Sequence, residues 1–287
     1  MRPPPFNYIR ATSVAQALDV LASNEDGARL LAGGQSIVSM LNFRMITPSV
    51  LIDIANISEL RGITFSDGQV RIGATSRHSD VMRDPTILTH LPLVAEAYAH
   101  VAHHAIRNRG TIGGNICHHD LASELPLALT LLDAEFIVAA HAGERRIPAS
   151  DFFIDAYETA VGDKELLAAI EVPKQAADER FAFEEFAIRV GDYPIAGAAV
   201  RFRLNGSTLS DVRVGFIGTG IVRKRNAAAE KVLTGSSPTP DTFGRAVDAA
   251  RATVEPSSDV HATAEDKIDL IGVLLRRALE RAIDRRA

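Results

Sequence analysis

The sequence predicts an α+β protein with two domains, from its length and from a change of pattern along the chain. The chain has 287 residues, of which 46% are apolar, and a chain of this length commonly forms two domains of about 150 residues each. Up to residue 177, short apolar runs alternate with helix-like segments, whereas three strand-like runs and then three helices follow from residue 178. Lys174–Glu179 is polar and has no large apolar residue, so we place the domain boundary near residue 177.

Residues 1–56 are expected to form a small α/β lobe with a few parallel strands. Pro3–Pro5 exclude a helix, so residues 1–10 are interpreted as an extended arm. Ser13 precedes apolar residues at helical spacing and is a candidate N-cap. The expected elements are a helix over Val14–Leu21, strands at Arg29–Leu31 and Val50–Ile54, and a short helix that starts with Ser36 as its N-cap and runs through Leu41.

A second lobe is expected over residues 57–177. Proline breaks a helix interior, so Pro85 is expected to stop a single helical turn. The central stretch Arg107–Glu124 reads RNRGTIGGNICHHDLASE and is expected to contain a sharp glycine turn. The other expected elements are strands at Gln69–Ala74, Glu135–Ala140 and Leu166–Val172, a helical turn at Ser79–Arg83, and helices over Leu93–Ala102 and Leu125–Leu132.

Residues 178–287 are expected to form a three-stranded antiparallel sheet followed by helices. Asn205-Gly206 separates the second and third runs and is a strong hairpin signal. The last helix is the clearest, because its apolar residues fall on one stripe. The strands are predicted at Phe181–Arg189, Ile195–Leu204 and Leu209–Ile217, and the helices at Arg225–Leu233, Thr242–Val254 and Ala264–Arg285.

Two glycine motifs are the candidate ligand-binding elements. Ala32–Ser36 reads AGGQS after a predicted strand, and Thr111–Asn115 reads TIGGN after two arginines, Arg107 and Arg109. A backbone free of Cβ atoms lets a ligand approach its N–H groups closely, and the arginines favour an anionic ligand. Neither motif is G-x-G-x-x-G, and the chain has no G-x-x-x-x-G-K-[ST]. Taken alone, the central stretch could also be a tight hairpin or bulge with a few solvated polar residues.

Composition excludes several classes of function. The net charge is −5 at pH 7 and no basic stripe stands out, which argues against nucleic acid as the main partner. Cys117 is the only cysteine, so this chain forms no internal disulfide and lacks the roughly four thiolates of an iron–sulfur cluster. No apolar run approaches the ~18 residues of a transmembrane helix, and the start of the chain lacks the apolar segment of a secretory signal. A cytoplasmic location is therefore expected.

The two glycine motifs together resemble the paired flavin signatures of the FAD-binding medium subunits of molybdenum hydroxylases. That family includes the carbon monoxide dehydrogenase medium subunit and the FAD domain of xanthine dehydrogenases. The resemblance extends across essentially the whole chain. It implies a two-lobed FAD-binding domain of the vanillyl-alcohol-oxidase/PCMH type over residues 1–177, with lobes at about 1–56 and 57–177. A C-terminal domain of the CO dehydrogenase flavoprotein type would cover residues 178–287.

The resemblance also implies which residues contact FAD. The family commonly has Asp-Pro-Ala-Ser/Asn-Asp/Glu after the second motif, and here Leu121 takes the place of the proline, which should loosen that turn. Glu185 stands near a position where some relatives carry a lysine that can contact the adenine end. The implied cofactor-binding residues are Ala32, Gly33, Gly34, Gln35, Ser36, Thr111, Ile112, Gly113, Gly114, Asn115, Asp120, Ser123, Glu124, Leu167 and Tyr193.

Within this set, the backbone of Leu167 is expected against the adenine, and Tyr193 over one face of the isoalloxazine. Structural roles remain open for some of these residues. Asp120 and Glu124 suit the N-terminus of a helix electrostatically. Leu167 suits a core, and Tyr193 suits an exposed turn.

The implied function is that of an FAD-binding electron-transfer subunit of a heterotrimeric molybdenum hydroxylase, with no catalytic side chain of its own. Its expected partners are a large molybdopterin-binding subunit and a small [2Fe-2S] subunit, in a dimer of heterotrimers. A stand-alone flavin oxidase or dehydrogenase is one alternative, and an assembly subunit without flavin is another. His100 and His104 have a metal-ligand spacing, but with no H-E-x-x-H and no cysteine pair we predict no metal site.

Overall fold

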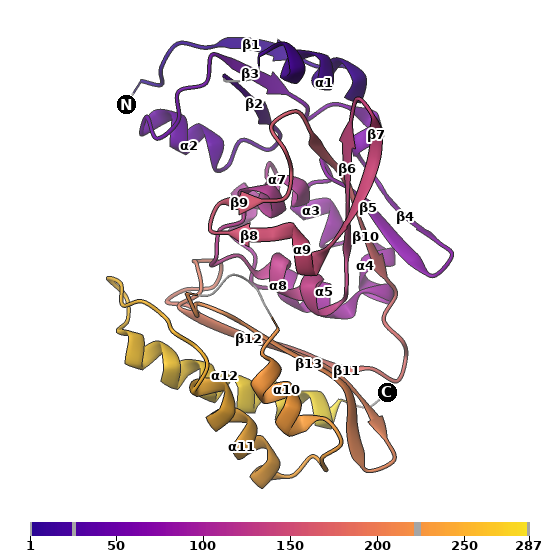
Figure 1. Ribbon diagram of the computed structural model, residues 1–287, viewed down its shortest axis with the longest axis vertical. Helices are drawn as coiled ribbons and strands as arrows, with labels where there is room; N and C mark the ends of the chain where they lie inside the picture. The colour runs from indigo at the N-terminus through magenta and orange to yellow at the C-terminus, as the bar shows by residue number, and fades with distance from the viewer. Residues whose placement is uncertain (1, 25–26, 221–224, 286–287) are drawn as a thin grey trace. The chain divides into compact units, whose positions relative to one another are not determined.

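A computed structural model describes residues 2–24, 27–220 and 225–285 (Figure 1). The chain divides into two compact units, which are described separately here. None of the described helices combines the length and the apolar character needed to cross a membrane. The first unit comprises Met1–Leu88, His104–His119 and Ala134–Pro173, and the second comprises Thr89–His103, Asp120–Asp133 and Lys174–Ala287.

The first unit starts with a small lobe on a three-stranded parallel sheet, as predicted. The strand order is β1 (Asn7–Arg10), β3 (Val50–Asp53) and β2 (Ala28–Leu31), and both outer strands run parallel to β3. The arm predicted for residues 1–10 therefore ends in a strand, since each residue of β1 pairs with one of β3. α1 (Val14–Ser23) begins as predicted at Ser13, whose hydroxyl accepts a hydrogen bond from a backbone amide of the first turn.

The three parallel strands end at one edge of this sheet. Arg10, Leu31 and Asp53 are the last residues of β1, β2 and β3. Ligands of parallel sheets bind preferentially beyond the carboxyl ends of the strands. The first glycine motif follows β2 directly and leads into α2 (Ile37–Asn42), so it stands at the edge where a ligand is expected.

A five-stranded antiparallel sheet forms the rest of the first unit's framework. Its order is β4 (Ile63–Ser66), β5 (Gln69–Gly73), β10 (Leu166–Pro173), β6 (Glu135–Ala140) and β7 (Gly143–Pro148). Leu166 and Ala168 of β10 and Ala139 of β6 share one apolar core with the small lobe. This common core fixes the first glycine motif relative to the larger sheet. The short elements around the sheet are η1 (Ser58–Leu60), α3 (His78–Val81), α6 (His104–Arg107), α7 (Ile112–His118), α9 (Ala149–Phe152), β8 (Phe153–Asp155) and β9 (Glu158–Thr159).

Two sequence predictions in this region are wrong. Pro85 does not stop a helix but begins one, α4 (Pro85–His90), because proline lacks only an N–H that is unpaired in the first helical turn anyway. The second glycine motif is not a turn but the first part of α7. Its glycines fit a helix there because the helix packs closely against the neighbouring backbone, as shown below.

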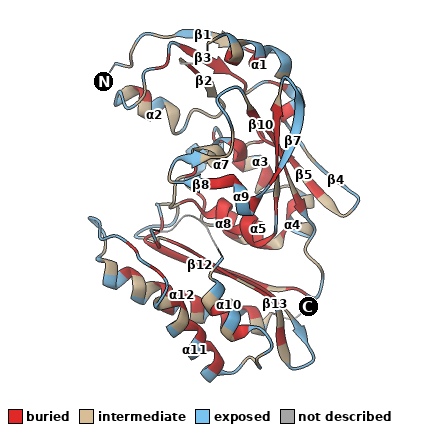
Figure 2. Ribbon diagram, viewed as in Figure 1, coloured by how far each residue is buried: buried red, intermediate tan, exposed pale blue. Residues whose placement is uncertain are grey.

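The second unit is a three-layer arrangement around an antiparallel sheet. The strands are β11 (Arg180–Phe186), β12 (Ala196–Asn205) and β13 (Thr208–Ile217), in that order. α5 (Pro92–Tyr98) and α8 (Glu124–Leu131) contact the sheet, and α10 (Ala227–Leu233), α11 (Pro240–Arg251) and α12 (Ala264–Asp284) share an apolar core with it. Side chains alternate across a strand, so β12 is covered on both faces and buried over most of its length (Figure 2). The predicted sheet-then-helices order is confirmed.

A buried ion pair ties α8 to this sheet. Arg201 of β12 donates to both carboxylate oxygens of Glu179, at 2.8 and 2.9 Å, and also to the Leu131 carbonyl oxygen at 3.3 Å. Arg213 of β13 donates to the same carbonyl at 3.2 Å. Two guanidinium groups therefore satisfy a carbonyl at the C-terminus of α8, where positive charge is favourable.

Candidate functional site

The first glycine motif presents a row of unused backbone donors. Gly34 has a φ of +77°, a conformation that favours glycine. Within the described chain, the backbone amides of residues 33–37 donate to no protein acceptor. Successive N–H groups of this kind form an anion-binding concavity, and a diphosphate has the charge and the acceptor oxygens that fit them.

Ser36 does not have the role predicted for it. It occupies the N-cap position of α2, but its side chain makes no capping hydrogen bond. Its φ of −102° and ψ of −53° are helical, whereas a capping side chain normally requires an extended backbone. The hydroxyl of Ser36 is therefore not committed to α2.

The second glycine motif is the tightly packed start of α7. Thr111 caps the helix by accepting a hydrogen bond from the Gly114 amide at 3.1 Å. A Cβ atom at Gly113 would lie 2.6 Å from the Ala74 carbonyl oxygen, so only glycine fits there. Gly114 differs, because it is exposed and only the Thr111 hydroxyl, at 2.9 Å, would crowd an added Cβ.

The two motifs lie against each other within the first unit. A Cβ atom at Gly33 would be 2.4 Å from the Arg109 carbonyl oxygen and 2.7 Å from the Gly110 Cα atom. A Cβ atom at Gly114 would be 3.9 Å from the Ala32 Cβ atom. The loops from the two lobes are therefore close enough to contact one small molecule.

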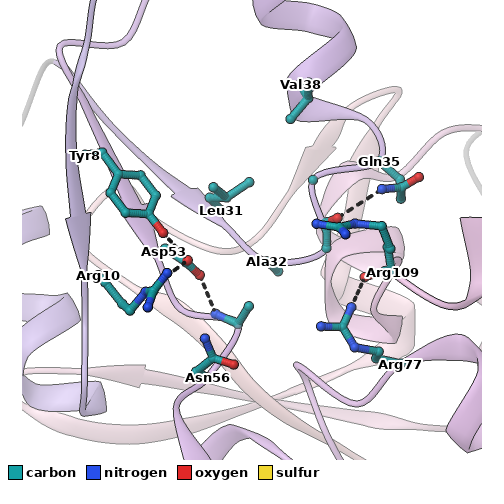
Figure 3. Close-up of a pocket in the computed structure, with 13 residues that line it drawn as sticks. Tyr8, Arg10, Leu31, Ala32, Gln35, Val38, Asp53, Asn56, Arg77 and Arg109 are labelled. Atoms are coloured by element: carbon teal, nitrogen blue, oxygen red, sulfur yellow. Dashed lines mark hydrogen bonds and ion pairs between the residues drawn. The ribbon is translucent and has the colours of Figure 1, made fainter.

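A pocket of about 530 Å³ opens beside the first motif, at the carboxyl edge of the parallel sheet. Figure 3 shows Tyr8, Arg10 and Asp53 on one side of it and Gln35, Arg77 and Arg109 on the other. The backbone of the first motif, from Ala32 to Gln35, forms part of its lining. Three guanidinium groups against one carboxylate give the pocket an excess of positive charge.

Hydrogen bonds hold the two sides of this pocket in place. Asp53 accepts from the Tyr8 hydroxyl and from the Ala55 amide, the latter at 2.9 Å. Arg10 Nε lies 3.8 Å from Asp53 Oδ2, so this carboxylate already has its own partners. On the other side, Arg77 donates to the Arg109 carbonyl oxygen at 2.6 Å, which braces the segment that contacts Gly33.

His78 contacts Gly110, the residue directly before the second motif. Its backbone amide donates to the Gly110 carbonyl oxygen at 3.1 Å, and its ring would be 2.9 Å from a Cβ atom at Gly110. Burial, and to a smaller extent the nearby Arg107 charge, lower the pKa of His78 to about 4. His78 is therefore neutral at pH 7, and Arg107 acts on it rather than lining the pocket.

The remaining predicted residues fall into two groups. Leu167 is buried on β10 in the first unit, whereas Asp120, Ser123, Glu124 and Tyr193 belong to the second unit. Their contact with FAD stays a prediction.

At the start of α8, hydrogen bonds close the turn in which Leu121 takes the place of the family's proline. The Asp120 carboxylate accepts from the Ala122 amide at 2.9 Å, and its carbonyl accepts from the Ser123 amide at 3.0 Å. Ser123 and Glu124 are buried, at 3% and 6% exposure. Tyr193 is 69% exposed, so its ring is accessible to a planar ligand.

Sequence reasoning did not select Tyr8, Arg10, Asp53 or Arg77. Tyr8 and Arg10 lie in the segment that the sequence indicates to be an extended arm. Asp53 ends an apolar run, and a polar residue at the carboxyl end of a parallel strand was a usable signal. Arg77 carries no local signal, because its role depends on a carbonyl far away in the sequence.

Comparison with known proteins identifies the family. Residues 4–175 match the FAD binding domain in molybdopterin dehydrogenase, and residues 181–282 match the CO dehydrogenase flavoprotein C-terminal domain. The chain therefore belongs to the FAD-binding flavoprotein family of the molybdopterin dehydrogenases. It is an oxidoreductase component with FAD as its cofactor, as the motifs predicted.

Individual relatives match over almost their whole length. Subunit alpha of the 6-hydroxypseudooxynicotine dehydrogenase complex of Paenarthrobacter nicotinovorans is 38% identical, over 99% of this chain and 97% of that one. The carbon monoxide dehydrogenase medium chain of Hydrogenophaga pseudoflava is 36% identical, over 98% of each. A solved structure of carbon monoxide dehydrogenase from Hydrogenophaga pseudoflava, which lacks the Mo-pyranopterin moiety, matches with a TM-score of 0.97, 37% identity and complete coverage of both chains.

Proposed function

We propose that this chain is the FAD-binding electron-transfer subunit of a heterotrimeric molybdenum hydroxylase. It would receive electrons from iron–sulfur clusters on a small [2Fe-2S] partner and pass them to an external acceptor. Substrate oxidation would take place on a large molybdopterin-binding partner, and the whole would form a dimer of heterotrimers. The relatives named above include subunits of dehydrogenase complexes, which supports this assignment.

The observation that carries the proposal is the contact between the two glycine motifs. Within the described residues, the amides of residues 33–37 have no protein acceptor, and they belong to a loop that approaches Arg109 so closely that only glycine fits at position 33. The predicted FAD residues of this unit, Ala32–Ser36 and Thr111–Asn115, supply amides and hydroxyl groups for the diphosphate. Arg77 and Arg109 add positive charge beside the first motif. Asp120, Ser123, Glu124, Leu167 and Tyr193 complete the proposed contacts.

The composition of the chain supports the proposal that partner chains hold the iron–sulfur clusters. FAD can accept electrons one at a time and then pass them on, and the protein supplies binding and orientation. Cys117 is the only thiol, so clusters that deliver electrons would be held by another chain. Burial raises the pKa of the Cys117 thiol to about 12, so this thiol stays protonated and is not a nucleophile.

The direct test is the visible spectrum of the purified full-length chain, before and after incubation with FAD. We expect a bound flavin with a resolved absorption spectrum, retained through gel filtration. A chain that neither contains nor takes up FAD would refute the proposal. Gly244→Ala is a suitable control, since an added Cβ there meets only the Arg276 guanidinium, at an ordinary 3.5 Å, and it should leave flavin content unchanged.

Partner assignment needs a separate measurement. Copurification of the chain from its native source should bring down a molybdopterin-containing chain and an iron–sulfur chain in equal amounts. Recovery of a flavin-loaded chain without either partner, together with turnover of a simple alcohol, would instead support a stand-alone flavin enzyme.

A further inference from the structure

The pocket beside the first glycine motif has a second wall, formed at the carboxyl ends of β1 and β3. Asp53, the last residue of β3, has a side chain that is only 12% exposed. Its Oδ1 atom accepts from the Ala55 amide at 2.9 Å, and its Oδ2 atom accepts from the Tyr8 hydroxyl, so the carboxylate is held in place at the pocket wall (Figure 3). Each carboxylate oxygen can accept two hydrogen bonds. Asp53 therefore has acceptor capacity left for a hydroxyl group of a ligand.

Polar side chains around Asp53 are available to the same ligand. Among the residues that the structure describes, the Asn56 amide and the Arg109 guanidinium make no hydrogen bond or ion pair, and both line the pocket. Arg10, whose side chain is 64% exposed, lies 3.8 Å from Asp53 and lines the same space. The pocket therefore combines one fixed acceptor with several donors that no protein group uses fully.

The lining of this pocket suits the adenosine half of FAD. The two halves of FAD are joined at the diphosphate, which the amides of residues 33–37 are proposed to bind, so one half extends over the pocket beside them. A ribose presents two neighbouring hydroxyl groups, and an acidic side chain near the carboxyl ends of parallel strands is their usual acceptor in dinucleotide-binding sheets. An adenine ring also stacks favourably against guanidinium groups. The isoalloxazine is a wider ring system with an apolar edge, whereas the side chains around this pocket are mostly polar.

Packing connects the pocket to β10. Ala32, which lines the pocket, packs against the apolar core that contains Leu166 and Ala168 of β10. Leu167, whose backbone is expected against the adenine, lies between these two residues in the strand. The pocket and the expected contact at Leu167 therefore belong to one packed region of the first unit.

We propose that this pocket holds the adenosine half of FAD, with the Asp53 carboxylate accepting hydrogen bonds from the ribose hydroxyl groups. Arg10, Asn56 and Arg109 surround the base and its phosphate, and Tyr8 is a positioning residue that holds Asp53 in place. This inference deepens the proposed function and rests on it, because it requires the diphosphate of FAD at the first motif. The chain therefore selects FAD over FMN, which lacks the adenosine.

The pocket is tested with ADP, which carries the adenosine and the diphosphate but no isoalloxazine. Calorimetric titration of the full-length chain, after removal of its flavin, should show that ADP binds and competes with FAD. FMN should bind at least about tenfold more weakly than FAD. FAD binding that ADP does not inhibit, or equal affinities for FAD and FMN, overturns the inference. Binding of ADP by a chain that cannot bind FAD refutes the proposed function instead.

The ribose contact is tested by removing one hydroxyl group from the ligand. The wild-type chain should bind 2′-deoxy-ADP or 3′-deoxy-ADP about tenfold more weakly than ADP, as for a lost hydrogen bond to a charged acceptor. In Asp53→Asn the same removal should cost clearly less, whereas Asp163→Asn, at an exposed position of the same unit, should behave as wild type. Equal losses in wild type and Asp53→Asn overturn the assignment of Asp53. Equal affinities of the wild-type chain for ADP and both deoxy forms also overturn it, and that comparison needs no variant.

Discussion

Gly33 lies so close to Arg109 that a Cβ atom on Gly33 would be 2.4 Å from the Arg109 carbonyl oxygen. Two segments from different lobes of the first unit therefore meet backbone to backbone. Rotation of a side chain cannot relieve such a contact, because the backbone fixes the position of a Cβ atom and the atom it meets is a backbone carbonyl oxygen. The first glycine motif is thus specified by packing as well as by the ligand it is proposed to bind.

Gly33→Ala should push the two glycine motifs apart. Because the collision is with a carbonyl oxygen, we expect FAD affinity to fall at least tenfold and the free energy of unfolding to fall by about 1–3 kcal/mol, as for overpacked sites. Flavin fluorescence titration and urea unfolding measure the two effects. Gly244→Ala provides the matched control, and wild-type affinity in Gly33→Ala would contradict the packing argument.

Gly114→Asp should separate binding from folding. Gly114 is exposed and an added Cβ crowds only the Thr111 hydroxyl, so we expect the circular dichroism spectrum to be retained. The new carboxylate would stand beside Ala32 and repel a diphosphate, so flavin should be lost on gel filtration. Gly114→Ala adds the Cβ without the charge and should lose less flavin. Unchanged flavin content in the aspartate variant would argue against diphosphate binding at this place.

His78 should make the chain less stable in acid. Its pKa is about 4 in the folded chain and about 6.5 in unfolded chains, so between these values the unfolded state binds more protons. Stability is therefore complete above pH 6.5 and falls as the pH drops toward 4, by up to roughly 3 kcal/mol. Urea unfolding at pH 4.5, 5.5 and 7 measures this loss.

The variants His78→Gln and His261→Gln isolate this contribution. His261 is exposed, so its replacement should leave the pH profile unchanged. His78→Gln should flatten the profile between pH 4.5 and 6.5. Parallel profiles for wild type and His78→Gln would show that the buried ring does not control acid stability.

Arg201→Met should destabilise the second unit strongly. The variant leaves Glu179 buried at 4% side-chain exposure without its bidentate partner, and breaking a buried pair in this way costs about 3–5 kcal/mol. Burial alone would raise the pKa of Glu179, but the hydrogen bonds from Arg201 lower it overall, so this carboxylate is ionised in the wild type. The double variant Arg201→Met with Glu179→Leu should recover much of the lost stability in urea unfolding. Equal stability of the single and double variants would contradict this account.

The sequence predicted best those elements that bury many apolar residues. β10 and β12 are buried over most of their length and are therefore rich in apolar residues, and the last helix places its apolar residues on one stripe. β7 was missed because five of its six residues are exposed and it carries two arginines, so no apolar pattern marks it. α7 was missed because two adjacent glycines disfavour a helix, and only its packing against Ala74 makes them suitable.

The candidate site was predictable in part. Glycine motifs can be recognised from a few neighbouring residues of the sequence. The structure brings Ala32 of the first motif next to Gly114 of the second. The bracing of Arg109 by Arg77 was not predictable, because it depends on an antiparallel bridge between Arg77 and Thr111 that no local pattern encodes. The division of the chain near residue 177 stays a prediction, as do the individual FAD contacts.

The placement of α8 limits where this chain can be divided into fragments. All eight of its residues are buried, and it packs on β12 and β13, although it precedes them by a long stretch of chain. In a fragment ending near residue 177, this helix would lose the sheet that covers it, and its apolar side chains would be exposed to water. A cut between the two matched family regions would therefore separate α8 from the strands on which it packs.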